Sequence, residues 1–252
     1  MSLTIERRYR GPARSGNGGY TAGLLSTHVP DAAGRPVEVT LRMPPPLETP
    51  LDVSTEGDVT RLLDGEKLVA EARLVPDELV PVEAVDAGVA AQTMSSYKGL
   101  EAHPFPGCFA CGPEREPGDG LQIFPGAVPD REGTVASLWV PHAAFAERGD
   151  IVDPGVERVG VPVTWAALDC VGGWAEALEG RPMVLGRITA RVDALPVVGE
   201  PHVAVGNLRG VEGRKSFTAS TLYDADGRVV ATAEHTWIAV DPAMFGGSVP
   251  TR

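Results

Sequence analysis

The carboxylate of Asp169 is the most distinctive chemical group in the sequence, because its neighbours in the expected helix, Trp165 and Leu168 among them, are apolar. A carboxylate in such surroundings loses part of its hydration, which makes it a stronger base. Asp169 is therefore a candidate general base or nucleophile. The alternative is a structural role, in which Asp169 caps a helix or forms a hydrogen bond across an interface.

A second candidate group is the glycine pair Gly18-Gly19, which follows Asn17 in the segment GNGGYTAGLLS. Small and apolar residues at helical spacing predict a short buried helix that begins near Gly18, with Asn17 as its N-cap. Backbone N–H groups at a helix N-terminus stabilise negative charge on a reacting carbonyl, an effect typically worth about 3 kcal/mol of barrier. The alternative is that the glycines serve only the close packing of the helix.

The cysteines are Cys108, Cys111 and Cys170, and the first two form a C-x-x-C pair. One such pair supplies half of the tetrahedral set that a structural zinc takes. His103 and Cys170 complete a set only if the fold brings them to the pair. A redox role needs a thioredoxin-like strand-to-helix context, which is missing from the sequence. We interpret the C-x-x-C segment as a packed turn and expect no metal and no cofactor.

Composition excludes several classes of function. The 252-residue chain carries a net charge of −12, which argues against partners such as nucleic acid or an anionic membrane surface. The N-terminus lacks the apolar core of a signal peptide and no run of about 18 apolar residues occurs, so we expect a cytoplasmic protein. No nucleophile elbow, P-loop, dinucleotide fingerprint or H-E-x-x-H motif is present.

The 30 glycines and 23 prolines predict many turns and short strands. Two groups of elements are expected, separated by a change of character over residues 76–107. We place the division of the chain into units at 1–97 and 98–252. The expected strands of the two units are 37–43, 51–58, 59–63 and 67–75, then 133–140, 183–194, 202–208, 215–224 and 228–240, with a second buried helix over 163–178.

The two halves follow the same order of elements. Each has a helix of small residues, then a Gly-Arg-Pro tripeptide (Gly34-Arg35-Pro36 and Gly180-Arg181-Pro182), then long strands closed by a turn that contains Asp-Gly. A helix followed by an antiparallel meander is what a sheet wrapped round a central helix requires. The sequence thus predicts an α+β fold.

The chain resembles the hotdog-fold thioesterase superfamily, and most closely the small phenylacetate-pathway type of acyl-CoA thioesterase. The resemblance lies in Cys108-Phe109-Ala110-Cys111-Gly112-Pro113 followed by Gly120-Leu121-Gln122-Ile123-Phe124, in the helix start 164–169 and in the hairpin 224–237. Residues 16–75 are similar to a shorter hotdog unit, so that about four-fifths of the chain is covered. The resemblance implies a double hotdog, in which two antiparallel sheets, each wrapped round a helix, join as a pseudo-dimer.

In this family a His-Gly-Gly turn leads into the helix and an acidic residue follows further along it. The first half has Asn17-Gly18-Gly19 at the turn and Ser26 at the acidic position, whereas the second has Gly160-Val161-Pro162 and keeps Asp169. Because the family's active site lies between two hotdog units, with the turn from one and the acid from the other, the surviving parts are complementary.

The resemblance therefore implies a thioesterase that hydrolyses or binds an acyl-CoA or a similar thioester. Asp169 would be the base or nucleophile, and the backbone N–H groups of Gly18 and Gly19 would donate to the thioester carbonyl oxygen. The substrate-binding residues would be Asn17, Tyr20, Ser26 and Trp165. The alternatives are a non-catalytic acyl-CoA or lipid-binding protein, since His-Gly-Gly is missing, and a hotdog dehydratase or hydratase, which would need a catalytic histidine with an acid. A homodimer is compatible with the sequence but is not determined by it.

Overall fold

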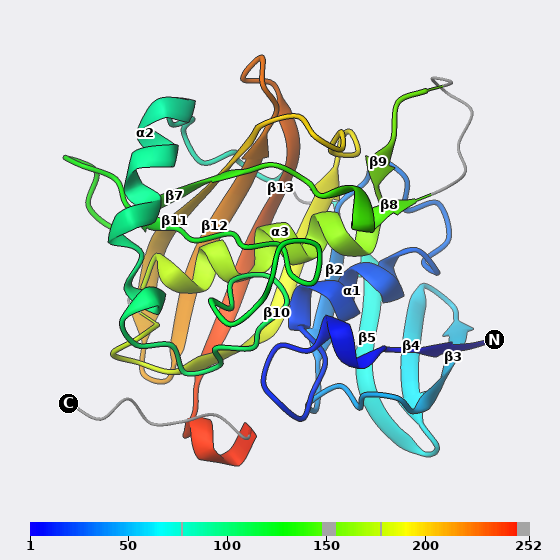
Figure 1. Ribbon diagram of the computed structural model, residues 1–252. Helices are drawn as coiled ribbons and strands as arrows, with labels where there is room; N and C mark the ends of the chain where they lie inside the picture. The colour runs from blue at the N-terminus through cyan, green and yellow to red at the C-terminus, as the bar shows by residue number, and fades with distance from the viewer. Residues whose placement is uncertain (77, 148–154, 177, 246–252) are drawn as a thin grey trace.

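One antiparallel sheet of 11 strands crosses the whole molecule, and helices cover one of its faces (Figure 1). The computed structural model describes residues 1–76, 78–147, 155–176 and 178–245. The strand order is β1-β3-β4-β5-β2-β10-β13-β12-β11-β7-β6. Strands β1–β5 thus form one end of the sheet and the later strands form the other.

The strands of the main sheet are β1 (Ser2–Thr4), β2 (Val37–Leu41), β3 (Pro50–Glu56), β4 (Val59–Asp64), β5 (Lys67–Leu74), β6 (Gly126–Ala127), β7 (Thr134–Trp139), β10 (Met183–Val192), β11 (His202–Glu212), β12 (Lys215–Tyr223) and β13 (Val229–Ala239). A separate pair consists of β8 (Ala146–Glu147) and β9 (Arg158–Val159). The α-helices are α1 (Gly18–Ser26), α2 (Ala87–Thr93) and α3 (Val161–Trp174). Short 3-10 helices are η1 (Arg7–Tyr9), η2 (Met94–Ser96), η3 (Lys98–Leu100), η4 (Ala143–Phe145) and η5 (Pro242–Phe245).

The two halves join where β2 pairs antiparallel with β10, from Thr40 opposite Arg187 to Val37 opposite Ala190. These two strands follow the corresponding Gly-Arg-Pro tripeptides, so equivalent strands of the two halves meet at the centre of the sheet. Such a pairing of equivalent elements is typical of a two-fold arrangement. It confirms the expectation that the two sheets join into one.

Most expected elements are present with shifts of one or two residues. Three differences have local causes. Gly57, with a φ of 60°, forms a turn where a strand was expected to continue. β11 runs to Glu212 instead of residue 208, because a bulge between Leu208 and Gly210 keeps the strand in register. Helix α2 was not expected; it is short, and Asp86 caps it by accepting from the N–H groups of Gly88 and Val89.

Helix α1 begins at Gly18 as predicted, and the Asn17 Oδ1 accepts a 2.8 Å hydrogen bond from the N–H of Tyr20. This bond satisfies one of the helix's free N-terminal donors, as an N-cap does. Helix α3 begins at Val161, two residues before the expected start, because Pro162 lacks an N–H and is readily accommodated in the first helical turn. The last expected residues of this helix include residue 177, which lies outside the described residues.

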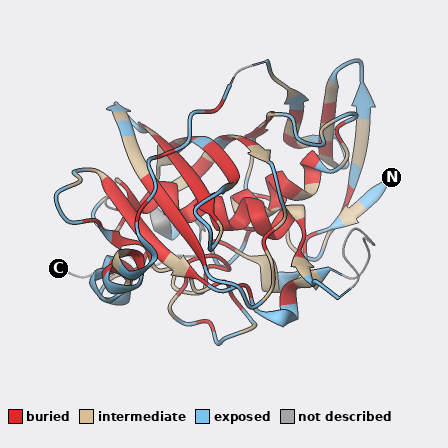
Figure 2. Ribbon diagram, turned by 90° about the horizontal axis from the view of Figure 1, so that it is seen from above, coloured by how far each residue is buried: buried red, intermediate tan, exposed pale blue. Residues whose placement is uncertain are grey.

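Every residue of α3 except Val161 is buried, which accounts for its nearly continuous apolar sequence. Figure 2 shows that burial is concentrated in the central helices and the central strands. The main core accordingly contains residues from α1, α3 and both ends of the sheet. None of the helices in the described part of the chain combines the length and apolar character needed to cross a bilayer.

The segment before the expected division contacts the second half. The N–H of Val82 donates to Thr221 Oγ1 at 2.8 Å, and Ala90 of α2 belongs to a small core cluster with Val205 and Ala219. The division at residues 97 and 98 stays a prediction.

Helices α1 and α3 pack closely because α1 presents glycines to α3. A Cβ added to Gly23 would lie 2.7 Å from Trp165 Cβ and 2.8 Å from Pro162 Cα. At Gly19 it would lie 2.5 Å from Asp169 Cβ and 2.6 Å from the Trp165 carbonyl oxygen. These separations are too short for carbon atoms in contact, so any side chain at either position would push the helices apart.

Gly23→Ala should lower the free energy of unfolding. Alanine gains helix propensity, but the neighbouring Cα and Cβ atoms cannot move without α3, so a net loss of about 1–2 kcal/mol is expected. Chemical denaturation measures this change. Gly210→Ala is the control, because a Cβ there has nothing within 4 Å. Equal stability of the two variants would contradict the close packing of the helices.

His235 lies beneath α3, where burial lowers its pKa from 6.5 to about 4. Its Nδ1 lies 3.2 Å from Thr218 Oγ1 on the neighbouring strand. Since the unfolded chain takes up the proton first as pH falls, unfolding is favoured progressively between pH 6.5 and 4. The cost reaches about 3 kcal/mol for this group.

His235→Gln should therefore show a shallower loss of stability than the wild type over this pH interval. His142→Gln, the same substitution at an exposed histidine, is the control for the exchange itself. Thermal melts across the interval make the comparison. Identical pH dependence in the wild type and His235→Gln would show that the imidazole is not held neutral by burial.

Candidate functional site

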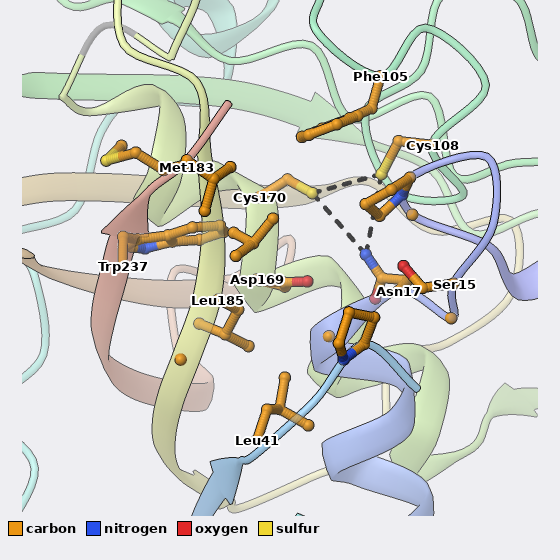
Figure 3. Close-up of a pocket in the computed structure, with 18 of the residues that line it drawn as sticks. Ser15, Asn17, Leu41, Phe105, Cys108, Asp169, Cys170, Met183, Leu185 and Trp237 are labelled. Carbon is orange, nitrogen blue, oxygen red and sulfur yellow. Dashed lines mark hydrogen bonds between the residues drawn. The ribbon is translucent and has the colours of Figure 1, made fainter. Parts of the chain in front are cut away.

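A cavity of about 270 Å³ lies between the start of α1, the middle of α3, the 103–111 loop and strands β10 and β13 (Figure 3). Side chains from both halves of the chain form its walls. The apolar part of the lining comes from Leu41, Met43, Phe105, Leu178, Met183, Leu185 and Trp237. Apart from Arg42, which pairs with Glu71, the polar side chains of the lining are gathered near Asn17 and Asp169, so the cavity has one polar end.

Asp169 and Gly19 meet across the contact between the halves. The N–H of Gly19 donates a 2.8 Å hydrogen bond to Asp169 Oδ2. The aspartate is only 2% exposed, and its Oδ1 has no hydrogen-bond partner among the described residues. A buried carboxylate oxygen without a partner is uncommon, and where one occurs it frequently serves a ligand, an ordered water or a reaction.

Burial raises the pKa of Asp169 from 3.8 to about 7, against the opposing effect of the Gly19 hydrogen bond. Negative charge on Cys108 contributes to the increase. A carboxyl group with a pKa near neutrality accepts a proton more readily than an ordinary aspartate. Burial of the carboxylate thus acts in the direction expected from the apolar sequence around Asp169.

The two glycines of the turn are not equivalent. The Gly19 N–H is engaged by the Asp169 carboxylate. The N–H of Gly18, which lines the cavity, has no partner among the described residues. The start of α1 therefore has one N–H that anchors the acid and one that remains available to an oxygen in the cavity.

The loop before α1 is fixed by backbone hydrogen bonds. The N–H of Asn17 donates to the Tyr9 carbonyl at 2.8 Å, and the N–H of Gly16 donates to the Pro45 carbonyl at 2.9 Å. While Oδ1 of Asn17 caps the helix, its Nδ2 lies 3.8 Å from Cys108 Sγ and 3.9 Å from Cys170 Sγ. Asn17 thus both caps α1 and lines the cavity.

The other three residues expected to bind substrate do not line this cavity. Tyr20 stacks on Tyr9, with ring centroids 3.9 Å apart. Ser26 donates to the Gly23 carbonyl and lines, with Trp165, a second hollow at the opposite end of α1. Ser26 is far from the cavity because it is the last residue of α1, whereas the cavity borders the first turn of that helix.

Several cavity residues were not expected from the sequence as substrate contacts. The C-x-x-C loop reaches the cavity because the N–H of Phe109 donates to the Arg10 carbonyl, and that of Leu121 to the Phe109 carbonyl, both at 2.8 Å. Cys170 follows Asp169 on α3, and it could have been identified as a neighbour of the acid. Met183 and Trp237 lie on separate strands, and only the sheet register brings them together.

The sequence matches no protein-family model, and a search of curated proteins finds no significant match. Solved structures are similar over almost the whole chain. A tesB protein of Mycobacterium avium subsp. paratuberculosis matches with a TM-score of 0.58 and 13% identity, covering 95% of this chain and 92% of that one. An acyl-CoA thioesterase II, TesB2, of Mycobacterium marinum matches with a TM-score of 0.57 and 8% identity, covering 96% and 93%.

A hot dog fold protein of Alicyclobacillus acidocaldarius matches with a TM-score of 0.51 and 13% identity, covering 96% of this chain and 93% of that one. At these identities the likeness concerns the fold. Together with the paired sheet-and-helix halves described above, it identifies this chain as having the double-hotdog fold.

Proposed function

We propose that the chain hydrolyses an acyl-CoA or a closely similar thioester in the cavity between its two halves, with Asp169 as general base. The observation that carries the proposal is the 2.8 Å contact between the Gly19 N–H and Asp169 Oδ2. It joins an acid from the second half to an amide-rich helix start from the first half, beside a cavity that both halves line.

The cavity suits a molecule with an apolar part and one reactive polar centre. Leu41, Leu185 and Met183 offer contacts for an acyl chain, while Gly18 and Asp169 lie at the polar end. Binding sites for small molecules commonly combine an apolar lining with a few convergent polar groups. One of the solved structures that share the fold is described as an acyl-CoA thioesterase II, which supports this class of substrate.

In the proposed reaction, Asp169 Oδ1 takes a proton from a water molecule as that water attacks the thioester carbonyl. The carbonyl oxygen gains negative charge, which the Gly18 N–H and the positive end of α1 stabilise. When the intermediate collapses, the carbon–sulfur bond breaks and the acid forms. The proton held by Asp169 passes to the departing thiolate, so the carboxylate is regenerated.

The competing function is binding without turnover. Asn17 occupies the position at which the resembled family has histidine, and its side-chain oxygen is already engaged in capping the helix. The Asp169 carboxylate is also anchored and almost completely buried. A protein with these features could hold an acyl thioester without hydrolysing it. An assay for the released thiol separates the two functions.

Asp169→Asn should reduce kcat for acyl-CoA hydrolysis by about 10²–10⁴-fold while changing KM little, because the amide keeps the shape but cannot accept the water proton. Thiol release from a panel of acyl-CoAs of increasing chain length, followed with a chromogenic thiol reagent, measures both constants. Blanks without substrate correct for the protein's own cysteines.

Asp52→Asn provides the matched control, since it makes the same chemical change at an exposed residue of β3 that does not line the cavity. Unchanged turnover in Asp169→Asn would remove Asp169 from the mechanism. Wild-type protein that binds acyl-CoA tightly in calorimetry without releasing thiol would instead establish the binding function.

A further inference from the structure

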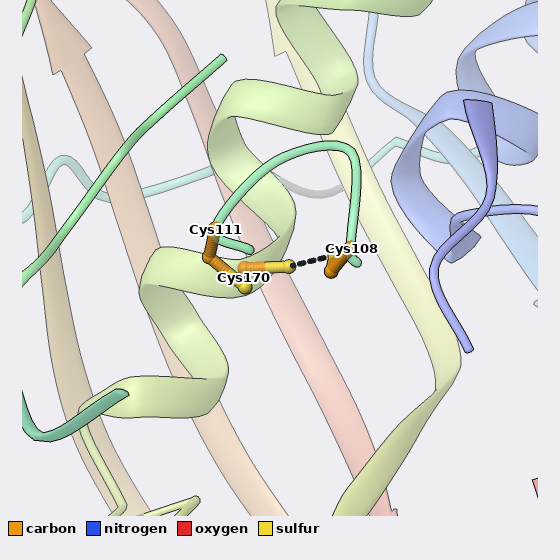
Figure 4. Close-up of side chains that lie close together, drawn as sticks. All are labelled: Cys108, Cys111 and Cys170. Atoms are coloured by element: carbon orange, nitrogen blue, oxygen red, sulfur yellow. Dashed lines mark hydrogen bonds between the residues drawn. The ribbon is translucent and has the colours of Figure 1, made fainter. Parts of the chain in front are cut away.

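The three cysteines of the chain converge at the polar end of the cavity (Figure 4). Cys108 and Cys111 come from the 103–111 loop and Cys170 from α3. All three are buried and free, and their sulfur atoms lie within 4.8 Å of one another. The fold therefore brings Cys170 to the C-x-x-C pair, which the sequence alone left undetermined.

From this convergence we infer that Cys108, Cys111 and Cys170 form a trithiolate site for a thiophilic d¹⁰ cation, with Zn²⁺ as the ion it would take. Sulfur ligands at about 2.3 Å from a tetrahedral zinc lie about 3.8 Å apart. Cys108 Sγ and Cys170 Sγ are already 3.6 Å apart. The remaining separations exceed the tetrahedral value by about 1 Å at most, a difference that small side-chain rotations remove.

The loop that carries two of the sulfurs is tightly turned. The N–H of Gly112 donates to the Cys108 carbonyl at 2.9 Å, and a Cβ at Gly112 would lie 2.5 Å from both the Cys108 nitrogen and its carbonyl oxygen. Only glycine fits this turn without displacing the loop. The hydroxyl of Tyr97 donates to the Cys111 carbonyl at 2.8 Å and holds the other side of the loop. The two loop sulfurs are thus held on a rigid frame.

His103 contributes a hydrogen bond to the sulfurs and not a fourth ligand. Its Nδ1 accepts the N–H of Phe105 at 2.9 Å, so in the neutral ring the proton lies on Nε2. That nitrogen lies 3.3 Å from Cys111 Sγ, toward which it donates.

Further donors surround the sulfurs. Asn17 Nδ2 lies 3.8 Å from Cys108 Sγ and 3.9 Å from Cys170 Sγ. Donors of this kind stabilise thiolates and tune the ions they bind. Binding of Zn²⁺ would release the protons of the cysteine thiols.

The proposed coordination set leaves one position of the tetrahedron without a protein sulfur. The cavity is lined by all three cysteines, so this position is open to water or to an added thiol. The inference does not depend on hydrolysis of thioesters, because its test reads metal binding directly.

The test uses the full chain, reduced with a phosphine, freed of metal by a chelator and then titrated with ZnCl₂ or CoCl₂. We expect a single Zn²⁺ per chain by elemental analysis after dialysis. Co²⁺ should give thiolate charge-transfer absorption and the intense ligand-field bands of a four-coordinate ion. Cys111→Ser and Cys170→Ser should each weaken Zn²⁺ binding by more than about 100-fold, as measured by competition with a chromophoric chelator.

His103→Gln should weaken Zn²⁺ binding by about 10–100-fold, the usual effect of losing a partner of a metal ligand. His142→Gln is the matched control, because His142 Nδ1 accepts the N–H of Ala144 at 3.0 Å in the same type of turn, with no cysteine beside it. Thermal melts with chelator present show whether each variant is folded. If the cysteine variants unfold, a protection experiment on the wild type takes their place: bound Zn²⁺ should slow the alkylation of its thiols.

Three results would overturn the inference. The first is less than a tenth of an equivalent of bound Zn²⁺ at micromolar free metal. The second is Zn²⁺ binding that Cys111→Ser and Cys170→Ser leave unchanged in folded protein, which would place the ion elsewhere. The third is a Cys108–Cys170 disulfide that persists in the purified protein after treatment with the phosphine, detected as a mass deficit and a loss of titratable thiols.

Discussion

The close crossing of α1 and α3 is the constraint on which the site depends. Gly19 and Gly23 have no side chains, so α3 can lie directly against α1 and the Asp169 carboxylate reaches the Gly19 N–H. An alanine-sized group at either glycine would separate the helices by more than the length of that hydrogen bond tolerates. Packing and chemistry therefore have the same cause, and the two interpretations of the glycine pair in the sequence are not exclusive.

Much of the architecture could be predicted from the sequence. The Asn17 cap, the order of strands in each half and the pairing of the two halves follow from short-range patterns and from the repeated Gly-Arg-Pro. The facing of Gly18-Gly19 and Asp169 was expected only through the resemblance to a family whose active site lies between two units. No pattern within either half could have indicated that contact, because it joins residues 150 positions apart in the sequence.

Other features depend on distances that the sequence does not encode locally. The Asp169 carboxylate accepts from the Gly19 N–H and leaves that of Gly18 as the available donor. This choice depends on the distance between α1 and α3. Ser26 was expected at the cleft because it matches Asp169 in the repeat, yet it lies at the far end of α1. The cysteine cluster requires both the path of the C-x-x-C loop and the rotation of α3, and neither follows from spacing.

The site gathers the polar groups that a buried helix ordinarily excludes. Asp169 and Cys170 are adjacent on α3, and Asn17 and Cys108 face them from other segments. Burial raises the pKa of Asp169, and hydrogen bonds with Cys108 and Cys111 raise the pKa of Cys170, so the proton positions within the cluster are interdependent. Such local departures from an apolar core are expected where function, not stability, has determined the residues.

The fusion of two hotdog units in one chain has an evolutionary consequence. In a homodimer every substitution appears at both symmetry-related seams, whereas a fused chain can alter one seam alone. Here the second hollow is lined by Ser26, Val161 and Trp165, and Ser26 stands at the position in the first half that corresponds to Asp169 in the second. Fusion thus allows one seam to hold the buried Asp169 carboxylate against the Gly19 N–H while the other seam is lined by different residues.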